Sequence, residues 1–117
     1  TRLWPGNSPR PVLFASDRIP PHAAVRTRNP IILDPSRPLE ENMSDLYSIH
    51  KITSLMVEGG AKTLKTFIDA ALFDEIRIET APLAINRGTP APTIRTELAT
   101  LIEDREIRAS NIRRYKP

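Results

Sequence analysis

The sequence predicts an α/β fold, with a mixed, partly parallel sheet flanked by helices and a C-terminal antiparallel hairpin. Three observations favour it. Stretches with helix and strand periodicity alternate between residues 38 and 80. Short apolar runs precede them, and two further strand-like runs around a polar turn end the chain. The 117 residues suffice for one domain with a modest core.

Two short strands are predicted in the first third of the chain. Residues 11–15 read Pro-Val-Leu-Phe-Ala, a continuously apolar run that is typical of a strand buried on both faces. Pro20 and Pro21 then mark a connection, because proline lacks the N–H that a helix or a sheet needs. The apolar run Ile31–Leu33, which stops before an Asp-Pro pair, predicts the second strand.

The middle of the chain predicts a helix, a strand, a second helix and another strand. The first helix begins at Pro38 and has an acidic first turn. Residues 52–57 form a β-branched, apolar run that predicts a strand. Apolar side chains then recur every three or four residues over 61–72, as in a helix, and residues 76–80 alternate as in a strand. Because helices separate these strands, we expect right-handed crossovers and a partly parallel sheet.

The last third predicts a loop and a hairpin. Residues 84–95 are rich in glycine, threonine and proline, which is typical of a loop. Apolar residues on either side of the polar stretch 109–111 predict two antiparallel strands with a turn at Ala-Ser-Asn.

The composition excludes several classes of site. The chain has no cysteine, so disulfides, thiolate metal sites and cysteine nucleophiles are impossible, and the expected compartment is the cytoplasm. The two histidines, His22 and His50, cannot build a metal site by themselves, and His50 is expected to compensate the dipole at a helix end. No apolar stretch approaches membrane-spanning length, so we expect no membrane partner.

Basic residues gather near the C-terminus, although the net charge is only +3. They are Arg105, Arg108, Arg113, Arg114 and Lys116. Such a group suits acidic ligands, and it is also typical of a solvated strand face. The few aromatic residues do not interleave with these cations, so we expect no nucleic-acid partner.

The candidate binding site lies where residues 57–60 read Val-Glu-Gly-Gly, between a predicted strand and a predicted helix. Paired glycines let the backbone approach a ligand closely, and the first turn of a helix offers unpaired N–H groups at the positive end of its dipole. Lys62 falls on the solvent side of this helix, and Thr63 lies in its first turn. A phosphate site and a tight connection between packed elements both fit this pattern.

Residues 54–82 carry a longer pattern. They read Ser-Leu-Met-Val-Glu-Gly-Gly-Ala-Lys-Thr-Leu, then Phe-Ile-Asp-Ala-Ala-Leu-Phe-Asp-Glu-Ile-Arg-Ile, then Ala-Pro. This pattern resembles the C-terminal reductase domain of the bifunctional riboflavin-biosynthesis deaminase/reductase, in which Val-Glu-Gly-Gly or Val-Glu-Ala-Gly leads into a helix. The resemblance implies a dihydrofolate-reductase-like fold, NADPH as the cofactor, and reduction of 5-amino-6-(5-phosphoribosylamino)uracil to its ribitylamino product.

The resemblance also implies roles for individual residues. The stretch that matches the cofactor-phosphate site comprises Gly60, Ala61, Lys62, Thr63, Leu64, Lys65 and Thr66. Glu58 matches a substrate contact, and a carboxylate there suits hydroxyl or amino donors better than a pyrophosphate. Arg2 matches a second substrate contact, and Ser16 a further cofactor contact. No catalytic side chain is nominated, because hydride transfer depends on alignment and the cofactor carries the chemistry.

The chain departs from this family in what it lacks. The zinc-binding Cys/His motifs of the deaminase half are absent, so we expect neither deamination nor a metal site. The start of the reductase domain is also missing, so residues 1–117 are expected to be the C-terminal part of an N-terminally truncated domain. A sheet without its first strands has an open edge, so we expect a homodimer.

Two further functions stay open beside an NADPH-dependent reductase. One is a noncatalytic nucleotide- or anion-binding module that uses the basic C-terminal tail. The other is a structural dimerisation piece with no activity of its own.

Overall fold

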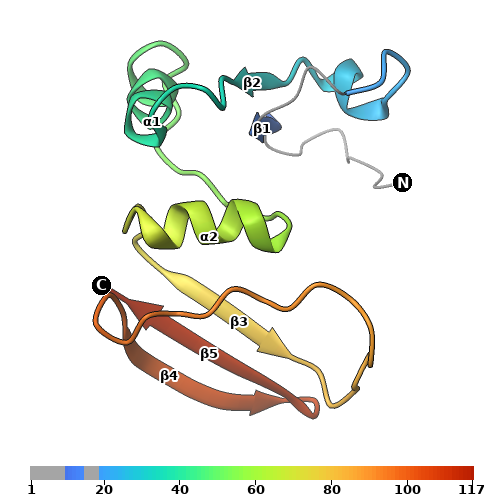
Figure 1. Cartoon of the computed structure of the whole chain (residues 1–117), viewed down its shortest axis with the longest axis vertical. Coiled ribbons are helices and arrows are strands. Elements are labelled where there is room, and N and C mark those ends of the chain that lie inside the picture. The colour runs from blue at the N-terminus through green and yellow to red at the C-terminus, as the bar shows by residue number, and fades with distance from the viewer. Residues whose placement is uncertain (1–9, 15–18) are drawn as a thin grey trace. The chain divides into compact units, whose positions relative to one another are not determined.

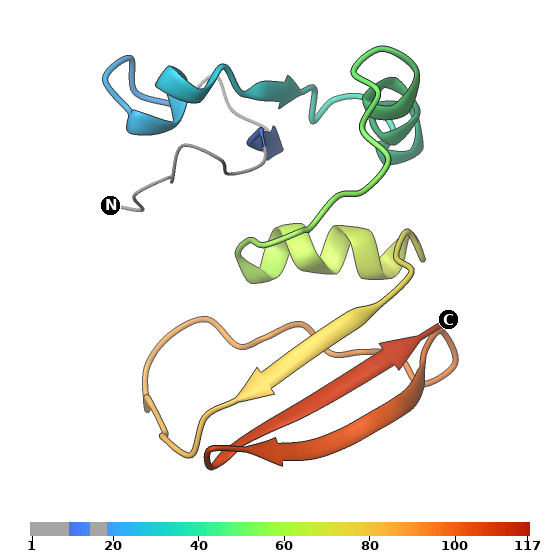
Figure 2. The ribbon, with the colours of Figure 1, turned by 180° about the vertical axis from the view of Figure 1, so that it is seen from behind.

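The computed structural model describes residues 10–14 and 19–117, and the chain divides into two compact units, Thr1–Ser54 and Leu55–Pro117. The first unit contains β1 (Val12–Phe14), a 3₁₀ helix (Ala24–Arg28), β2 (Ile31–Leu33) and α1 (Leu39–Ser48). The second contains α2 (Ala61–Asp69), β3 (Ile76–Thr80), β4 (Thr100–Ile107) and β5 (Ser110–Lys116). Both units mix helices with strands, which is consistent with the predicted α/β class (Figure 1, Figure 2).

In the first unit, β1 and β2 form a short parallel pair. Val12 lies opposite Ile31, and Phe14 lies opposite Leu33. Ile31 and Leu33 are buried, whereas Ile32 between them is 52% exposed. The two predicted strands are therefore confirmed, and β2 buries one of its faces.

The helix α1 covers nearly the range that the sequence predicts. Its inward face consists of Leu39, Asn42 and Leu46, which are buried at three- and four-residue spacing. Beyond Ser48 the chain turns at Lys51, which has a left-handed φ of 59°. The Lys51 ammonium donates to the Ser48 carbonyl at 2.7 Å, so a cation satisfies one of the free carbonyls at the helix end.

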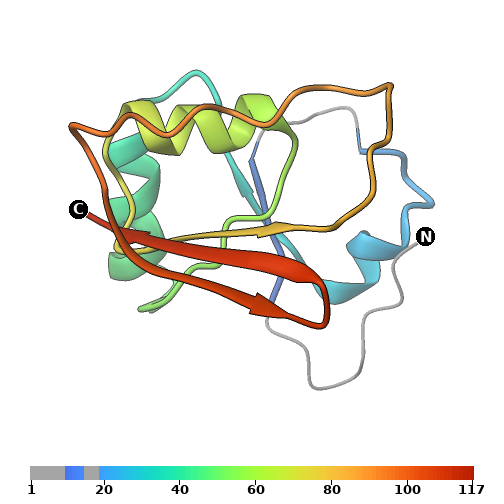
Figure 3. The same cartoon turned by 90° about the horizontal axis from the view of Figure 1, so that it is seen from below.

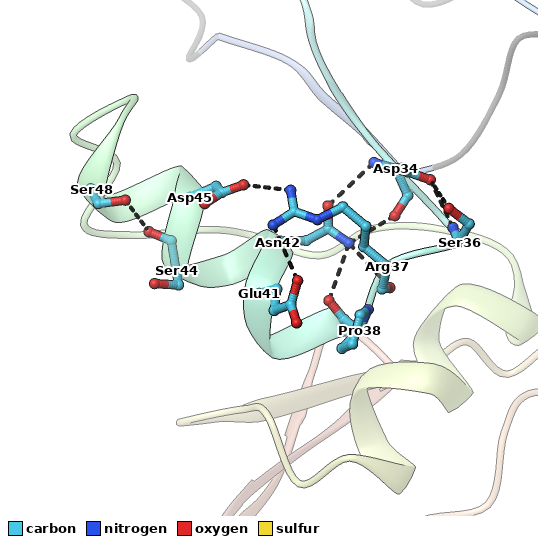
Figure 4. A network of polar contacts seen from close by, with 9 residues as sticks. All are labelled: Asp34, Ser36, Arg37, Pro38, Glu41, Asn42, Ser44, Asp45 and Ser48. Carbon is cyan, nitrogen blue, oxygen red and sulfur yellow. Dashed lines mark hydrogen bonds and ion pairs between the residues drawn. The ribbon is translucent and has the colours of Figure 1, made fainter.

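The side-chain amide of Asn42 fastens α1 to the loop that follows β2 (Figure 4). Asn42 is only 2% exposed. Its Nδ2 donates to the Asp34 carbonyl at 2.8 Å, and its Oδ1 accepts from the Asp34 N–H at 3.2 Å. The same Nδ2 lies 3.4 Å from the Arg37 carbonyl and 3.3 Å from the Pro38 carbonyl. One buried side chain thus bonds to both backbone groups of Asp34 and lies near two further carbonyls of the loop.

Charged groups hold the same loop from its exposed side. The Asp34 carboxylate accepts from the Ser36 N–H at 2.8 Å and from the Ser36 hydroxyl at 2.6 Å, which lowers the pKa of Asp34. Arg37 pairs with Asp45 at 2.6 Å and with Glu41 at 3.2 Å. Exposed ion pairs stabilise little, so we assign most of the loop's fixation to Asn42.

In the second unit, β5 is the central strand of a three-stranded antiparallel sheet with the order β3-β5-β4 (Figure 3). β3 pairs with β5 along its whole length, from Ile76 opposite Tyr115 to Thr80 opposite Asn111. Residues 81–99 connect β3 to β4 without a helix or a strand. The predicted strand, the predicted loop and the predicted hairpin are therefore confirmed.

The strand predicted over residues 52–57 is absent. These residues belong to neither a helix nor a strand, and no described strand pairs with them. A strand persists only where a neighbour takes up its backbone N–H and C=O groups. The single sheet expected from the sequence is consequently two sheets, a parallel pair and an antiparallel trio.

The helix α2 ends at Asp69, whereas the sequence predicts its continuation to Leu72. Ala71 has a left-handed φ of 54°, and its N–H donates back to the Ile68 carbonyl at 3.0 Å. The Leu72 N–H donates to the Phe67 carbonyl at 3.0 Å. These two bonds form a Schellman-type end, in which glycine is the usual left-handed residue, so the alanine gave no stop signal.

The turn of the hairpin lies at Arg108 and Ala109, one residue before the predicted stretch 109–111. Ile107 lies opposite Ser110, and the two residues between them have left-handed φ values of 49° and 68°. Two-residue hairpin turns with positive φ at both positions normally carry Asn-Gly or Asp-Gly. The sequence has Arg-Ala at these two positions, so its pattern predicts the turn at the polar stretch 109–111 instead.

Arg114 on β5 connects the central strand to both of its neighbours. Its guanidinium donates to Glu75, just before β3, at 2.9 and 2.8 Å, and to Glu103 of β4 at 2.8 Å. The hydrogen bonds from Arg114 lower the pKa of both carboxyl groups, and the two carboxylates raise the pKa of Arg114. One guanidinium therefore links β5 to β4 and to the residue that precedes β3.

Replacement of Asn42 tests how much the first unit depends on this amide. We expect Asn42→Ala to lower the free energy of unfolding by about 2 kcal/mol, because it removes the buried amide and its bonds to both backbone groups of Asp34. The matched control is Ser48→Ala, which removes only an exposed hydroxyl bond to the Ser44 carbonyl and should change stability by less than about 0.5 kcal/mol. Urea denaturation followed by circular dichroism measures both. Equal effects of the two variants would contradict the role given to Asn42.

The ion pairs of Arg114 predict how stability depends on pH. The folded pKa of Glu75 and Glu103 lies below the ordinary value of 4.5, so their stabilisation is fully present above pH 4.5. It is lost as the pH falls from 4.5 through the folded pKa values. Urea midpoints measured from pH 7 downwards should therefore drop below pH 4.5, and less steeply in Arg114→Met. Parallel pH profiles for the wild type and the variant would show that the loss of stability below pH 4.5 does not come from the ion pairs of Arg114.

Candidate cofactor-binding site

The candidate site is the beginning of α2, where Gly60 is the N-terminal cap residue. Gly60 has φ −69° and ψ 164°, and as a glycine it offers no side-chain cap to the helix. The first bond within the helix runs from the Leu64 N–H to the Gly60 carbonyl at 3.2 Å. The N–H groups of Ala61, Lys62 and Thr63 precede that bond and have no partner within the helix. With no acidic residue in this turn, the helix end is suited to an anion.

The two glycines before α2 differ in what surrounds them. A Cβ built on Gly59 would lie 3.1 Å from the Cβ of Thr63, so a side chain there would crowd the first turn of α2 unless Thr63 shifted by a few tenths of an ångström. A Cβ built on Gly60 would meet no atom of a described residue within 4 Å, and the φ of Gly60 suits any residue. The fold therefore accounts for Gly59 but gives no reason for glycine at 60. The packing role of Gly59 was missed from sequence, where both glycines appeared equivalent.

Among the side chains of the predicted stretch, Lys62 carries the charge that is most available to a ligand. Lys62 is exposed and makes no ion pair with a described residue, whereas Lys65 pairs with Asp69 one turn later. The Thr66 hydroxyl donates to the Lys62 carbonyl at 3.0 Å, so it is directed at the helix backbone. Thr63 is half-buried beside Gly59.

Of the remaining predicted residues, three lie in the described part of the second unit and two lie outside the described residues. Ala61 and Leu64 are half-buried residues of α2, and Glu58 is an exposed residue two positions before Gly60. Glu58, Gly60 and α2 thus belong to one continuous segment of the second unit. Arg2 and Ser16 lie outside the residues that the structure describes.

The basic C-terminal tail is largely neutralised. Arg113 pairs with Asp104 at 3.1 Å, and Arg105 pairs with Glu103 at 2.7 Å. Arg114 is engaged by its two carboxylates, as described above. These pairs correspond to a solvated strand face, and among the described residues they leave Arg108 and Lys116 as the tail cations without an ion pair for the anion-binding module that the sequence also allowed.

The described residues contain no group of three or more His, Asp or Glu side chains that could hold a metal ion. No helix in the described part of the chain has the length and apolar character needed to cross a membrane.

Comparison with known proteins gives a family. The model of the RibD C-terminal domain matches residues 1–111, and neither a curated protein nor a solved structure matches the chain. The resemblance that residues 54–82 indicate is therefore confirmed over most of the sequence. This chain belongs to the RibD C-terminal domain family, the reductase domain of riboflavin biosynthesis.

Proposed function

We propose that this chain binds NADPH and takes part in reducing 5-amino-6-(5-phosphoribosylamino)uracil to its ribitylamino product in riboflavin biosynthesis. Membership of the family supports a reductase. The observation that carries the cofactor proposal is the open space at Gly60, beside an uncapped helix end. No described atom lies within 4 Å of a Cβ built at Gly60, which leaves room for a phosphate group beside the positive end of the helix dipole.

The residues of α2 contribute to the proposed site in different ways. The backbone N–H groups of Ala61, Lys62 and Thr63 donate to the cofactor phosphates, and the Lys62 ammonium adds a charge. The other members of the matching stretch, Leu64, Lys65 and Thr66, stabilise the helix that presents this first turn.

The substrate contacts are proposed from the family pattern. Glu58 precedes the phosphate site, where its carboxylate would accept hydrogen bonds from hydroxyl or amino groups of the substrate. Arg2 would bind the substrate phosphate, because a guanidinium pairs well with such a group. Ser16 would provide one more cofactor contact.

The chemistry itself belongs to the cofactor. When bound, NADPH supplies the hydride that reduces the substrate. The chain's own residues bind and orient, since hydride transfer requires donor and acceptor carbons to be close and aligned. Accordingly, no side chain of this chain is assigned as a nucleophile or a general acid. The proposal includes a cytoplasmic homodimer.

Valine at position 60 tests the open space directly. We expect Gly60→Val to fold like the wild type, because the φ of this position suits any residue and a Cβ there lies within 4 Å of no described atom. We expect it to weaken NADPH binding at least about tenfold by filling the phosphate space. Titration of the full chain with NADPH, followed by cofactor fluorescence, measures the change. The melting temperature of the variant serves as the folding control. A folded variant with unchanged affinity would exclude Gly60 from the site.

Charge removal at two matched lysines distinguishes NADPH binding at the beginning of α2 from anion binding by the basic C-terminal tail. Lys62→Gln should weaken NADPH binding, whereas Lys116→Gln removes the same charge from the basic tail and should leave it unchanged. Both variants are titrated with NADPH and with RNA at two salt concentrations. Steeply salt-dependent RNA binding that falls in Lys116→Gln, with no response to NADPH in any variant, would favour the module instead.

A further inference from the structure

The two ends of α2 differ in how firmly the fold holds them. The buried residues of this helix, Phe67 and Ile68, lie in its C-terminal half, and each is 7% exposed. The residues of its first turn, from Ala61 to Leu64, are half-buried or exposed. The helix is therefore anchored at its C-terminal half, and the first turn, with the candidate phosphate site, lies at the less firmly held end.

A short connection joins the anchored end of α2 to β3. Residues 70–75 form the whole of this connection. Its first part is bonded back to the helix, because the N–H groups of Ala71 and Leu72 donate to the carbonyls of Ile68 and Phe67, both at 3.0 Å. Few torsions of the connection are thus left free, so the place where it ends helps to set the direction of the helix.

Arg114 fixes the point at which this connection ends. Its Nε and Nη2 donate to the two carboxylate oxygens of Glu75, at 2.9 and 2.8 Å, so the pair sets an orientation as well as a distance. Both side chains are 37% exposed, whereas those of the neighbouring pair, Arg113 and Asp104, are 51% and 41% exposed. Since Arg114 belongs to the central strand β5, Glu75 is held by the best-supported strand of the sheet.

The length of α2 amplifies a disturbance at its anchored end. Nine residues make a helix about 13 Å long, so a tilt of about 5° would move its first turn by about 1 Å. Hydrogen bonds from N–H groups to oxygen form over a donor–acceptor range of only about 0.5 Å. A phosphate bound at the first turn would therefore lose bonds when the other end of the helix is released.

We propose that Arg114 is a positioning residue for the cofactor site, because through Glu75 it fixes the connection 70–75 and with it the direction of α2. This inference rests on the proposed function, since it concerns NADPH held by the first turn of α2. Glu103, the other carboxylate bound to Arg114, belongs to β4 and lies outside this route. Its pair with Arg114 stabilises the sheet without directing the helix.

Two matched carboxylate variants distinguish positioning from stability. Glu75→Gln and Glu103→Gln each remove the charge of one partner that Arg114 contacts at 2.8 Å, so both should lower the melting temperature. NADPH titration of the full chain, well below both melting temperatures, should show about fivefold weaker binding in Glu75→Gln and unchanged binding in Glu103→Gln.

A conservative change at Arg114 gives a second readout. Arg114→Lys keeps the charge but cannot form the two parallel bonds to Glu75, so it should fold with a melting temperature near that of the wild type. It should nevertheless weaken NADPH binding about as much as Glu75→Gln does. Combining the two changes in one chain should weaken binding no further, because both act through the same contact.

Circular dichroism at the titration temperature checks that each variant is folded. Weaker NADPH binding in Glu75→Gln and Arg114→Lys, with wild-type binding in Glu103→Gln, supports the positioning role. Wild-type affinity in folded Glu75→Gln and Arg114→Lys overturns it, as does equal weakening in Glu103→Gln. Those results would leave the proposed function intact, whereas a wild-type chain that binds no NADPH would overturn the proposed function and the positioning role together.

Discussion

Every extended segment of this chain depends on a neighbour that can take up its backbone hydrogen-bonding groups. Where the described residues provide one, strands form: β1 with β2, and β3 and β4 with β5. Where they provide none, as at residues 52–57, an apolar, β-branched run stays irregular. Small sheets of this kind gain little stability from their ladders, so single polar side chains matter more. Asn42 plays that part in the first unit, and Arg114 plays it in the second.

The elements that the sequence predicts correctly are those whose signal is local. α1, α2 and β3 follow from side-chain periodicity over consecutive residues, and the hairpin follows from two apolar runs close together. The errors arise where the outcome depends on other parts of the molecule. Residues 52–57 needed a partner strand, which no local pattern can supply. The end of α2 at Ala71 and the turn at Arg108 use left-handed residues other than glycine, which sequence rules do not anticipate.

The candidate site shows the same division between local and nonlocal information. The segment from Glu58 into α2 could be recognised from sequence because glycines, a helix and a longer motif lie in one continuous stretch. The sequence could not show that the two glycines of this segment have different surroundings. Gly59 is constrained by Thr63, whose position follows only once the helix has formed, whereas Gly60 borders open space. The pairing of Lys65 with Asp69 likewise singles out Lys62 as the cation of the first turn that remains available.

The distribution of charge within the second unit bears on which surface binds an anion. In the hairpin, Glu103 lies opposite Arg114 and Asp104 lies opposite Arg113, so the strand register itself brings each cation to a carboxylate. An incoming phosphate would have to displace those partners. The first turn of α2 has no acidic residue, Gly60 offers no capping side chain, and Lys62 makes no ion pair with a described residue. Although the tail holds more basic residues, the beginning of α2 is the better place for a phosphate.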